Sequence, residues 1–168
     1  MVKVQSESPR KSWSHSVKPK IVVATIKSWN IDSANQLKKK LKSSYDVRII
    51  SDPKNLSYEF LKKWKPDYIF FPHWSWMIPA RIYDHFKCIV FHMTDLPYGR
   101  GGTPLQNLIL RDHKETMISA IKVVQALDAG PIYLKRKLSL KGSADQIFRR
   151  TAKVVFTQMI PRILRRRP

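Results

Sequence analysis

Short apolar runs alternate with amphipathic stretches along most of the chain. The first run, KIVVATI at residues 20–26, is β-branched and almost wholly apolar, which is typical of a strand buried on both faces of a parallel sheet. After a short loop, apolar residues recur at Ile31, Ala34, Leu37 and Leu41, with lysines on the opposite side. This spacing predicts a helix.

The same alternation continues to the end of the chain. Further strands are predicted at 45–50, 68–71, 88–91, 116–123 and 132–138, and further helices at 57–64, 79–86, from Thr103, and from Ser143 to about 159. The last two helices each begin with a capping-box pattern, TPLQ and SADQ. Strands that alternate with helices predict an α/β fold with a doubly wound, mainly parallel sheet. Ligands bind such sheets beyond the carboxyl ends of the strands.

One folded domain accounts for this pattern. Residues 1–18 are polar, rich in Ser and Lys and without apolar periodicity, so we expect a basic, mobile N-terminal arm. The domain is expected at 19–162, followed by a basic C-terminal tail at 163–168. No apolar run approaches the roughly 18 residues of a membrane span, and the N-terminus has no apolar core of a secretion signal. A cytoplasmic protein without membrane association is therefore expected.

Charge and composition narrow the function classes. The 168 residues carry 32 Lys and Arg against 12 Asp and Glu, a formal net charge of +20. Such a field attracts polyanions, whether nucleic acid, nucleotide phosphates or anionic lipid, without selecting among them. The single cysteine, Cys88, excludes an internal disulfide and a cysteine-based zinc site. No metal-ligand spacing, P-loop or GxSxG motif is present, so no metal is expected.

The segment 91–108, FHMTDLPYGRGGTPLQNL, is the first candidate for chemistry. His92 stands at the carboxyl end of the fourth strand, and three of the five glycines follow within four positions, where they allow a ligand to approach the backbone. Arg100 can donate to a phosphate or carboxylate, and the helix N-terminus at Thr103 can face an anion. An ordinary strand-to-helix crossover explains the same pattern. The candidate substrate-binding residues are Arg100, Gly101, Gly102 and Thr103.

Residues 89–104, IVFHMTDLPYGRGGTP, resemble the signature of folate-dependent formyltransferases, and within that family the catalytic domains related to methionyl-tRNA formyltransferase. The family pattern runs Asn-x-His, a short Ser/Leu-Leu-Pro stretch, then Arg-Gly-x-x-Pro. A second block, ALDAGPI at 126–132, matches the family's Asp loop at the family's distance from the histidine. The resemblance covers about 19–162 and implies a Rossmann-like formyltransferase fold.

The resemblance also implies a reaction and its residues. The formyl donor would be 10-formyltetrahydrofolate and the acceptor a primary amine. His92 would be the general base, a role that suits an imidazole titrating near neutrality. Asp128 would orient the ring and stabilise the imidazolium. The folate would lie against Trp74, Trp76, Met77, Ile78, Leu127 and Asp128, although tryptophan and isoleucine at such spacing are also ordinary core residues.

One position departs from the family pattern. Val90 stands where the family has an asparagine that stabilises the oxyanion, and loss of one such donor typically costs about 100- to 1000-fold in rate. Protonated His92, a backbone N–H at Gly101 or Gly102, and His73 are possible substitutes. The alternative is a weak or inactive formyltransferase-like module that binds nucleic acid or folate.

The acceptor is left open between methionyl-tRNA and an amino-sugar nucleotide, because both are anionic. The basic N-terminal and C-terminal arms are candidate contacts for nucleic acid. Related proteins continue into a second, smaller domain that helps tRNA-acting members hold their tRNA, and the sequence ends at Pro168.

Overall fold

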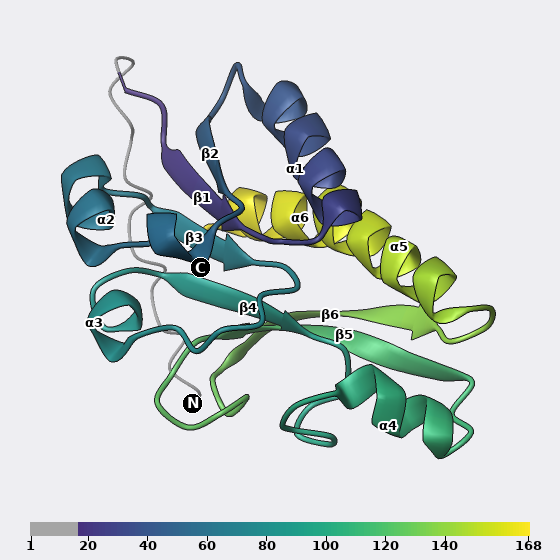
Figure 1. The fold of residues 1–168 in the computed structure, drawn as a ribbon. Helices are drawn as coiled ribbons and strands as arrows, with labels where there is room; N and C mark the ends of the chain where they lie inside the picture. The colour runs from purple at the N-terminus through teal and green to yellow at the C-terminus, as the bar shows by residue number, and fades with distance from the viewer. Residues whose placement is uncertain (1–16) are drawn as a thin grey trace, which may run out of the picture.

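The computed structural model describes residues 17–168 (Figure 1). The arm expected at 1–18 lies outside the described residues except for its last two. Six strands form one sheet in the order β2-β1-β3-β4-β5-β6. They are β1 (Lys20–Ala24), β2 (Asp46–Ile50), β3 (Tyr68–Phe71), β4 (Cys88–His92), β5 (Glu115–Lys122) and β6 (Ile132–Ser139).

The sheet is mainly parallel, as predicted. Strands β2, β1, β3 and β4 pair in parallel, and β5 and β6 add an antiparallel edge. The helices are α1 (Ser28–Leu41), α2 (Tyr58–Trp64), α3 (Ala80–Tyr83), α4 (Pro104–Leu110), α5 (Ala144–Val154) and α6 (Ile160–Arg166), with a short 3-10 turn at Pro53–Asn55. The predicted α/β architecture is confirmed, with most element boundaries within a few residues.

Helices cover both faces of the sheet, so the fold is doubly wound (Figure 1). Along β1, Ile21 and Val23 point into a core shared with α1, α4, α5 and α6. Val22 and Ala24 point into a second core shared with α2 and α3. This alternation explains why the strand sequence is apolar at every position: each face of the central sheet is buried.

The two predicted capping boxes differ in the structure. Ser143 caps α5, accepting from the Gln146 N–H, while the Gln146 side chain accepts from the Ser143 N–H. The capping box predicted at Thr103 is wrong. Thr103 precedes α4 in a left-handed conformation (φ 53°, ψ 43°), and its side chain makes no capping bond. An N-cap hydroxyl reaches the first turn from extended backbone, which Thr103 does not adopt.

The segment predicted as a C-terminal tail belongs to a packed helix. A π-helical turn at Val155–Met159 joins α5 to α6, and α6 continues to Arg166 with Ile163 and Leu164 buried. Pro161 lacks the N–H of a regular helix, and the wide π turn before it accommodates that missing bond without ending the helix. The core therefore extends past the boundary expected at 162. None of the helices at 17–168 has the length and apolar character needed to cross a bilayer.

Candidate active site

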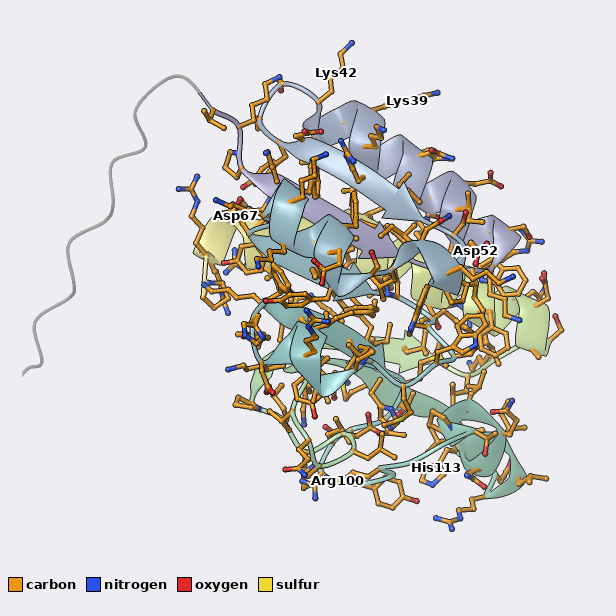
Figure 2. All side chains as sticks on the ribbon, turned by 60° about the vertical axis from the view of Figure 1, so that its left-hand side comes forward. Lys39, Lys42, Asp52, Asp67, Arg100 and His113 are labelled. Atoms are coloured by element: carbon orange, nitrogen blue, oxygen red, sulfur yellow. The ribbon has the colours of Figure 1, made fainter. Side chains whose placement is uncertain are left out.

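A cavity of about 680 Å³ opens beyond the carboxyl ends of the central strands. Its size is in the range of small-molecule sites, and its place is where α/β sheets bind ligands. It is lined by residues 71–78 after β3, 90–93 of β4 and its loop, 101–104, and 121–128 after β5, together with Asn30 of α1 and one face of α5. Every site residue proposed from the sequence lines this cavity except Arg100, which is exposed on the loop (Figure 2).

Two segments far apart in the sequence bring His92 and Asp128 together. His92 ends β4 with its side chain 8% exposed, and Asp128 lies in the β5–β6 loop with its side chain 12% exposed. His92 Nδ1 is 3.5 Å from Asp128 Oδ2, and His92 Nε2 is 2.7 Å from the Gly99 carbonyl oxygen. Each ring nitrogen therefore faces an oxygen that can only accept a hydrogen bond, and a neutral imidazole, which has one N–H, donates to one of the two.

A hydrogen bond joins the glycine loop (residues 99–102) to the aspartate loop (residues 124–130). The Gly101 N–H donates to Asp128 Oδ2 at 3.0 Å. The Gly101 N–H, one of the donors expected from the sequence to replace the family's asparagine, therefore already binds the Asp128 carboxylate. This bond fixes the same carboxylate oxygen that faces His92.

Backbone strain gathers around the cavity. His73, Thr103 and Asp128 have φ of 58°, 53° and 50°, and they are three of the six non-glycine residues at 17–168 with positive φ. Such conformations cluster at functional sites, where surrounding contacts hold them. His73 is held between aromatic rings: it lies edge-on to Trp29 and to Phe148 of α5. Burial, with a smaller effect of Lys27, lowers the pKa of His73, so its ring is neutral at neutral pH.

Aromatic and apolar side chains form the wall after β3. The Trp74 ring meets Trp76 and Phe71 edge-on, and Ile78 is buried beneath them. Trp76 and Met77 are 48% and 78% exposed at the rim, and Leu127, 56% exposed, belongs to the aspartate loop. The buried Trp74 indole N–H has no partner within the described part of the chain.

The floor of the cavity is apolar beside the histidine. Val90 lies two residues before His92 on β4, in register with Ile121 of β5, and both line the cavity. Valine offers no hydrogen-bond donor. The side chain expected from the family pattern at this point is therefore missing, and Val90 fills its place with hydrocarbon.

Several lining residues were not found from the sequence. Asn30, at the start of α1, is buried, and its amide nitrogen lies 3.4 Å from the Pro72 carbonyl oxygen. Phe148 and Thr151 reach the cavity from α5. Asn30 belongs to the stretch SWN at 28–30, and its place just beyond the carboxyl end of the first strand was a signal that could have found it. The two α5 residues carried none, because an amphipathic pattern does not tell which part of the apolar face meets a cavity. No group of His, Cys, Asp and Glu in residues 17–168 is arranged to hold a metal ion.

Several known proteins are similar to this chain in sequence and in fold. Methionyl-tRNA formyltransferase from Mycoplasmopsis pulmonis (strain UAB CTIP) is 30% identical over 128 residues, which are 73% of this chain and 44% of that protein. The solved methionyl-tRNA formyltransferase from Clostridium thermocellum is 53% identical with a TM-score of 0.88, covering 89% of this chain and 66% of that one. The chain belongs to the folate-dependent formyltransferase family.

Two further comparisons concern the length of the relatives and the fold. The chain spans less than half the length of the curated formyltransferases it matches. The formyltransferase PseJ from Anoxybacillus kamchatkensis, solved with UDP-4,6-dideoxy-4-formamido-L-AltNAc and tetrahydrofolate, has a TM-score of 0.66 at 20% identity and covers 87% of this chain and 76% of that one. At that identity PseJ shares the fold of this formyltransferase domain. The sequence matches no family model.

Proposed function

We propose that this domain transfers a formyl group from 10-formyltetrahydrofolate to a primary amine. The observation that carries the proposal is the meeting of His92 and Asp128, 3.5 Å apart, inside a cavity of about 680 Å³. A histidine and a carboxylate arranged in this way can accept and hold a proton. Family membership supplies the reaction class to which the pair is assigned.

The cavity suits a folate donor. In this proposal the pterin ring would lie between the wall of Trp74, Trp76 and Ile78 and the loop 124–128, all of which line the cavity. The backbone groups of that loop can bind its polar edge, because none of the N–H groups of 124–128 donates to another described residue. The donor, when bound, supplies an activated formyl carbon and a nitrogen leaving group. Its anionic glutamate tail suits the positive field of the protein.

His92 moves the proton in this scheme. As the amine nitrogen bonds to the formyl carbon, His92 accepts the proton that the amine loses. As the bond from the formyl carbon to the folate nitrogen breaks, His92 would return this proton to the leaving nitrogen, so the imidazole ends neutral. Asp128 stabilises the imidazolium in the interval, and the Gly101 N–H keeps its carboxylate in place.

The negative charge that develops on the formyl oxygen needs a donor. Val90 provides none, and the Gly101 N–H is engaged. The Gly102 N–H and the neutral His73 ring remain, since both residues line the cavity. The weak or inactive binding module is the second candidate function, and Val90 is the observation that favours it.

Methionyl-tRNA is the first acceptor to test. The sequence likeness to methionyl-tRNA formyltransferases supports it over an amino-sugar nucleotide, which is supported by likeness of fold alone. Both acceptors are anionic, and the net charge of +20 suits either.

The proposal is tested by following tetrahydrofolate release from 10-formyltetrahydrofolate with methionyl-tRNA present. His92→Asn is expected to lower kcat by about 100- to 10,000-fold, the usual contribution of a general base. Asp128→Asn is expected to lower it by about 100-fold or more, because the imidazolium loses its partner. Asp112→Asn is the matched control: Asp112 is an exposed loop aspartate with a similar left-handed backbone (φ 57°), and activity should be unchanged.

Two results would contradict the proposal. Acceptor-dependent release that survives His92→Asn would remove the histidine from the chemistry. Folate binding without turnover of either acceptor would instead establish the binding module.

A further inference from the structure

The Gly99 carbonyl oxygen is the closest partner of the His92 ring. It lies 2.7 Å from Nε2, whereas Asp128 Oδ2 lies 3.5 Å from Nδ1. A carbonyl oxygen accepts and never donates, so a contact of 2.7 Å requires a proton on Nε2. The neutral ring then has its lone pair on Nδ1, on the side of Asp128. The second ring nitrogen of a functional histidine commonly makes such a bond to a backbone carbonyl.

A second donor holds that carbonyl. The Thr94 hydroxyl donates to the same Gly99 oxygen at 3.2 Å, and Thr94 is 1% exposed. The two lone pairs of the oxygen are thus used by one side chain each. Gly99 is required in this arrangement: its φ is +72°, and a Cβ would stand 2.7 Å from the Thr94 methyl carbon. The loop closes tightly on Thr94, which leaves the carbonyl little freedom.

The sheet fixes Thr94 in turn. Ser119 pairs with His92 across β4 and β5, and Lys135 pairs with Ser119 across β5 and β6, so the three residues form a row. Ser119 is fully buried, and its hydroxyl donates to the Thr94 carbonyl oxygen at 2.7 Å. Lys135 Nζ donates to Asp95 and, at 2.6 Å, to the Leu96 carbonyl oxygen. Strands β4, β5 and β6 therefore hold both the His92 ring and the start of the loop that faces it.

We propose that Thr94 is a positioning residue, which holds the Gly99 carbonyl against His92 Nε2 and so leaves Nδ1 as the basic nitrogen. This rests on the proposed function for the statement that His92 acts as a base. The assignment differs from the sequence-based expectation, in which Asp128 orients the ring. In this proposal the bond from His92 Nε2 to the Gly99 carbonyl oxygen fixes the tautomer, and Asp128 faces Nδ1, the nitrogen that receives the proton.

Nitrogen-15 NMR of the histidine-labelled protein without substrate tests the tautomer. The His92 signals are identified by their loss in His92→Asn. At pH 8 we expect a protonated-type shift for Nε2 and an unprotonated-type shift for Nδ1. The opposite pattern, or protons on both nitrogens at this pH, would overturn the proposal. The measurement needs no turnover, so it is decided separately from the proposed transferase activity.

Variants test the part played by Thr94. Thr94→Val keeps the shape and removes the hydroxyl, and it should move both His92 shifts toward an average of the two tautomers. Formyl transfer should fall about 2- to 10-fold, the effect of one lost hydrogen bond. Thr94→Ser restores the hydroxyl and should restore both readouts. Thr25→Val is the control, because Thr25 is also fully buried and donates to a carbonyl, that of Pro72.

The outcomes separate positioning from stability. If Thr94→Val and Thr25→Val lose activity equally while the His92 shifts stay those of the wild type, Thr94 is merely structural and the proposal fails. If Thr94→Val does not fold, the shifts of the wild type and of Thr94→Ser still decide which nitrogen carries the proton. A correct tautomer without formyl transfer would remove the proposed function and leave the tautomer assignment standing.

Discussion

At the scale of single residues, Val90 separates the two functions proposed above, formyl transfer and ligand binding without turnover. It lines the cavity two residues before His92 and, in the proposed reaction, offers hydrocarbon where the oxyanion would need a donor. Val90→Asn is expected to raise kcat by about 10-fold or more, a fraction of the 100- to 1000-fold that a well-placed donor contributes. The check is the initial rate of tetrahydrofolate release.

Val90→Leu is the control, because it fills the same place without a donor and should not raise the rate. The amide should cost little stability, because position 90 is half-buried and faces the cavity. An unchanged kcat in Val90→Asn would mean that another donor, such as the Gly102 N–H or His73, already serves the oxyanion.

His73 gives the fold a pH dependence. Because burial, with Lys27, lowers its pKa, the unfolded chain binds a proton at a higher pH than the folded protein does. Stability is therefore full above the ordinary imidazole pKa of about 6.5 and falls as the pH drops from there through the lowered value. His73→Asn keeps a residue that tolerates positive φ and removes the titration, so its loss of stability between pH 8 and pH 5 should be smaller than that of the wild type. Urea midpoints at the two pH values measure this, and equal losses would contradict it.

The residue scale also shows what sequence reasoning could and could not find. The place of His92 at the cavity was predictable, because it follows a buried strand and precedes three glycines. Asp128 followed only from the family resemblance, since an aspartate in an Asp-Ala-Gly turn has an ordinary structural explanation. Arg100 was placed at the site by its neighbours in sequence, yet it is exposed outside the cavity. The Gly99 carbonyl was beyond prediction, because the direction of a backbone oxygen depends on the folded loop.

At the scale of elements, the starts of α4 and α5 look alike in sequence, but their N-cap residues should contribute differently to the free energy of unfolding. Ser143→Ala removes the cap of α5 and should cost about 1 kcal/mol of unfolding free energy. Thr103→Ala removes no cap, because Thr103 is left-handed and its side chain makes no capping bond, and it should stay within about 0.5 kcal/mol. Urea denaturation of both variants measures the difference. Equal losses would show that Thr103 caps α4 in solution.

Elements were predicted where periodicity was strong. The strands and long helices of the sheet core followed from apolar runs of the right length. The end of the chain did not: the predicted helix stopped at about 159 and a basic tail was expected at 163–168. In the structure the π turn carries the helix past Pro161, and Ile163 and Leu164 are buried. A proline in the sequence predicts that a helix ends, but the packing of the following residues determines whether it continues.

At the scale of the whole molecule, positive charge is spread widely. Figure 2 shows Lys39 and Lys42 at one end of the molecule and Arg100 near the other. Lys38, Lys39 and Lys40 follow one another at the exposed end of α1. A long polyanion can meet several such groups at once, whereas a nucleotide can meet few. The salt dependence of binding therefore distinguishes the two classes of acceptor.

If methionyl-tRNA is the acceptor, its affinity should fall about 1,000- to 100,000-fold between 50 and 200 mM salt, as expected for 6–10 phosphate contacts. An amino-sugar nucleotide, with two phosphates, should lose far less over the same range. Changing Lys38, Lys39 and Lys40 to Gln together should lower the slope of log K against log salt by up to about 3 if α1 lies in the footprint, and should leave folate binding unchanged. Fluorescence titration of labelled tRNA at several salt concentrations measures both quantities. A tRNA affinity that salt does not change, or a slope as small as that of the nucleotide, would exclude an extended footprint and shift the acceptor to the small molecule.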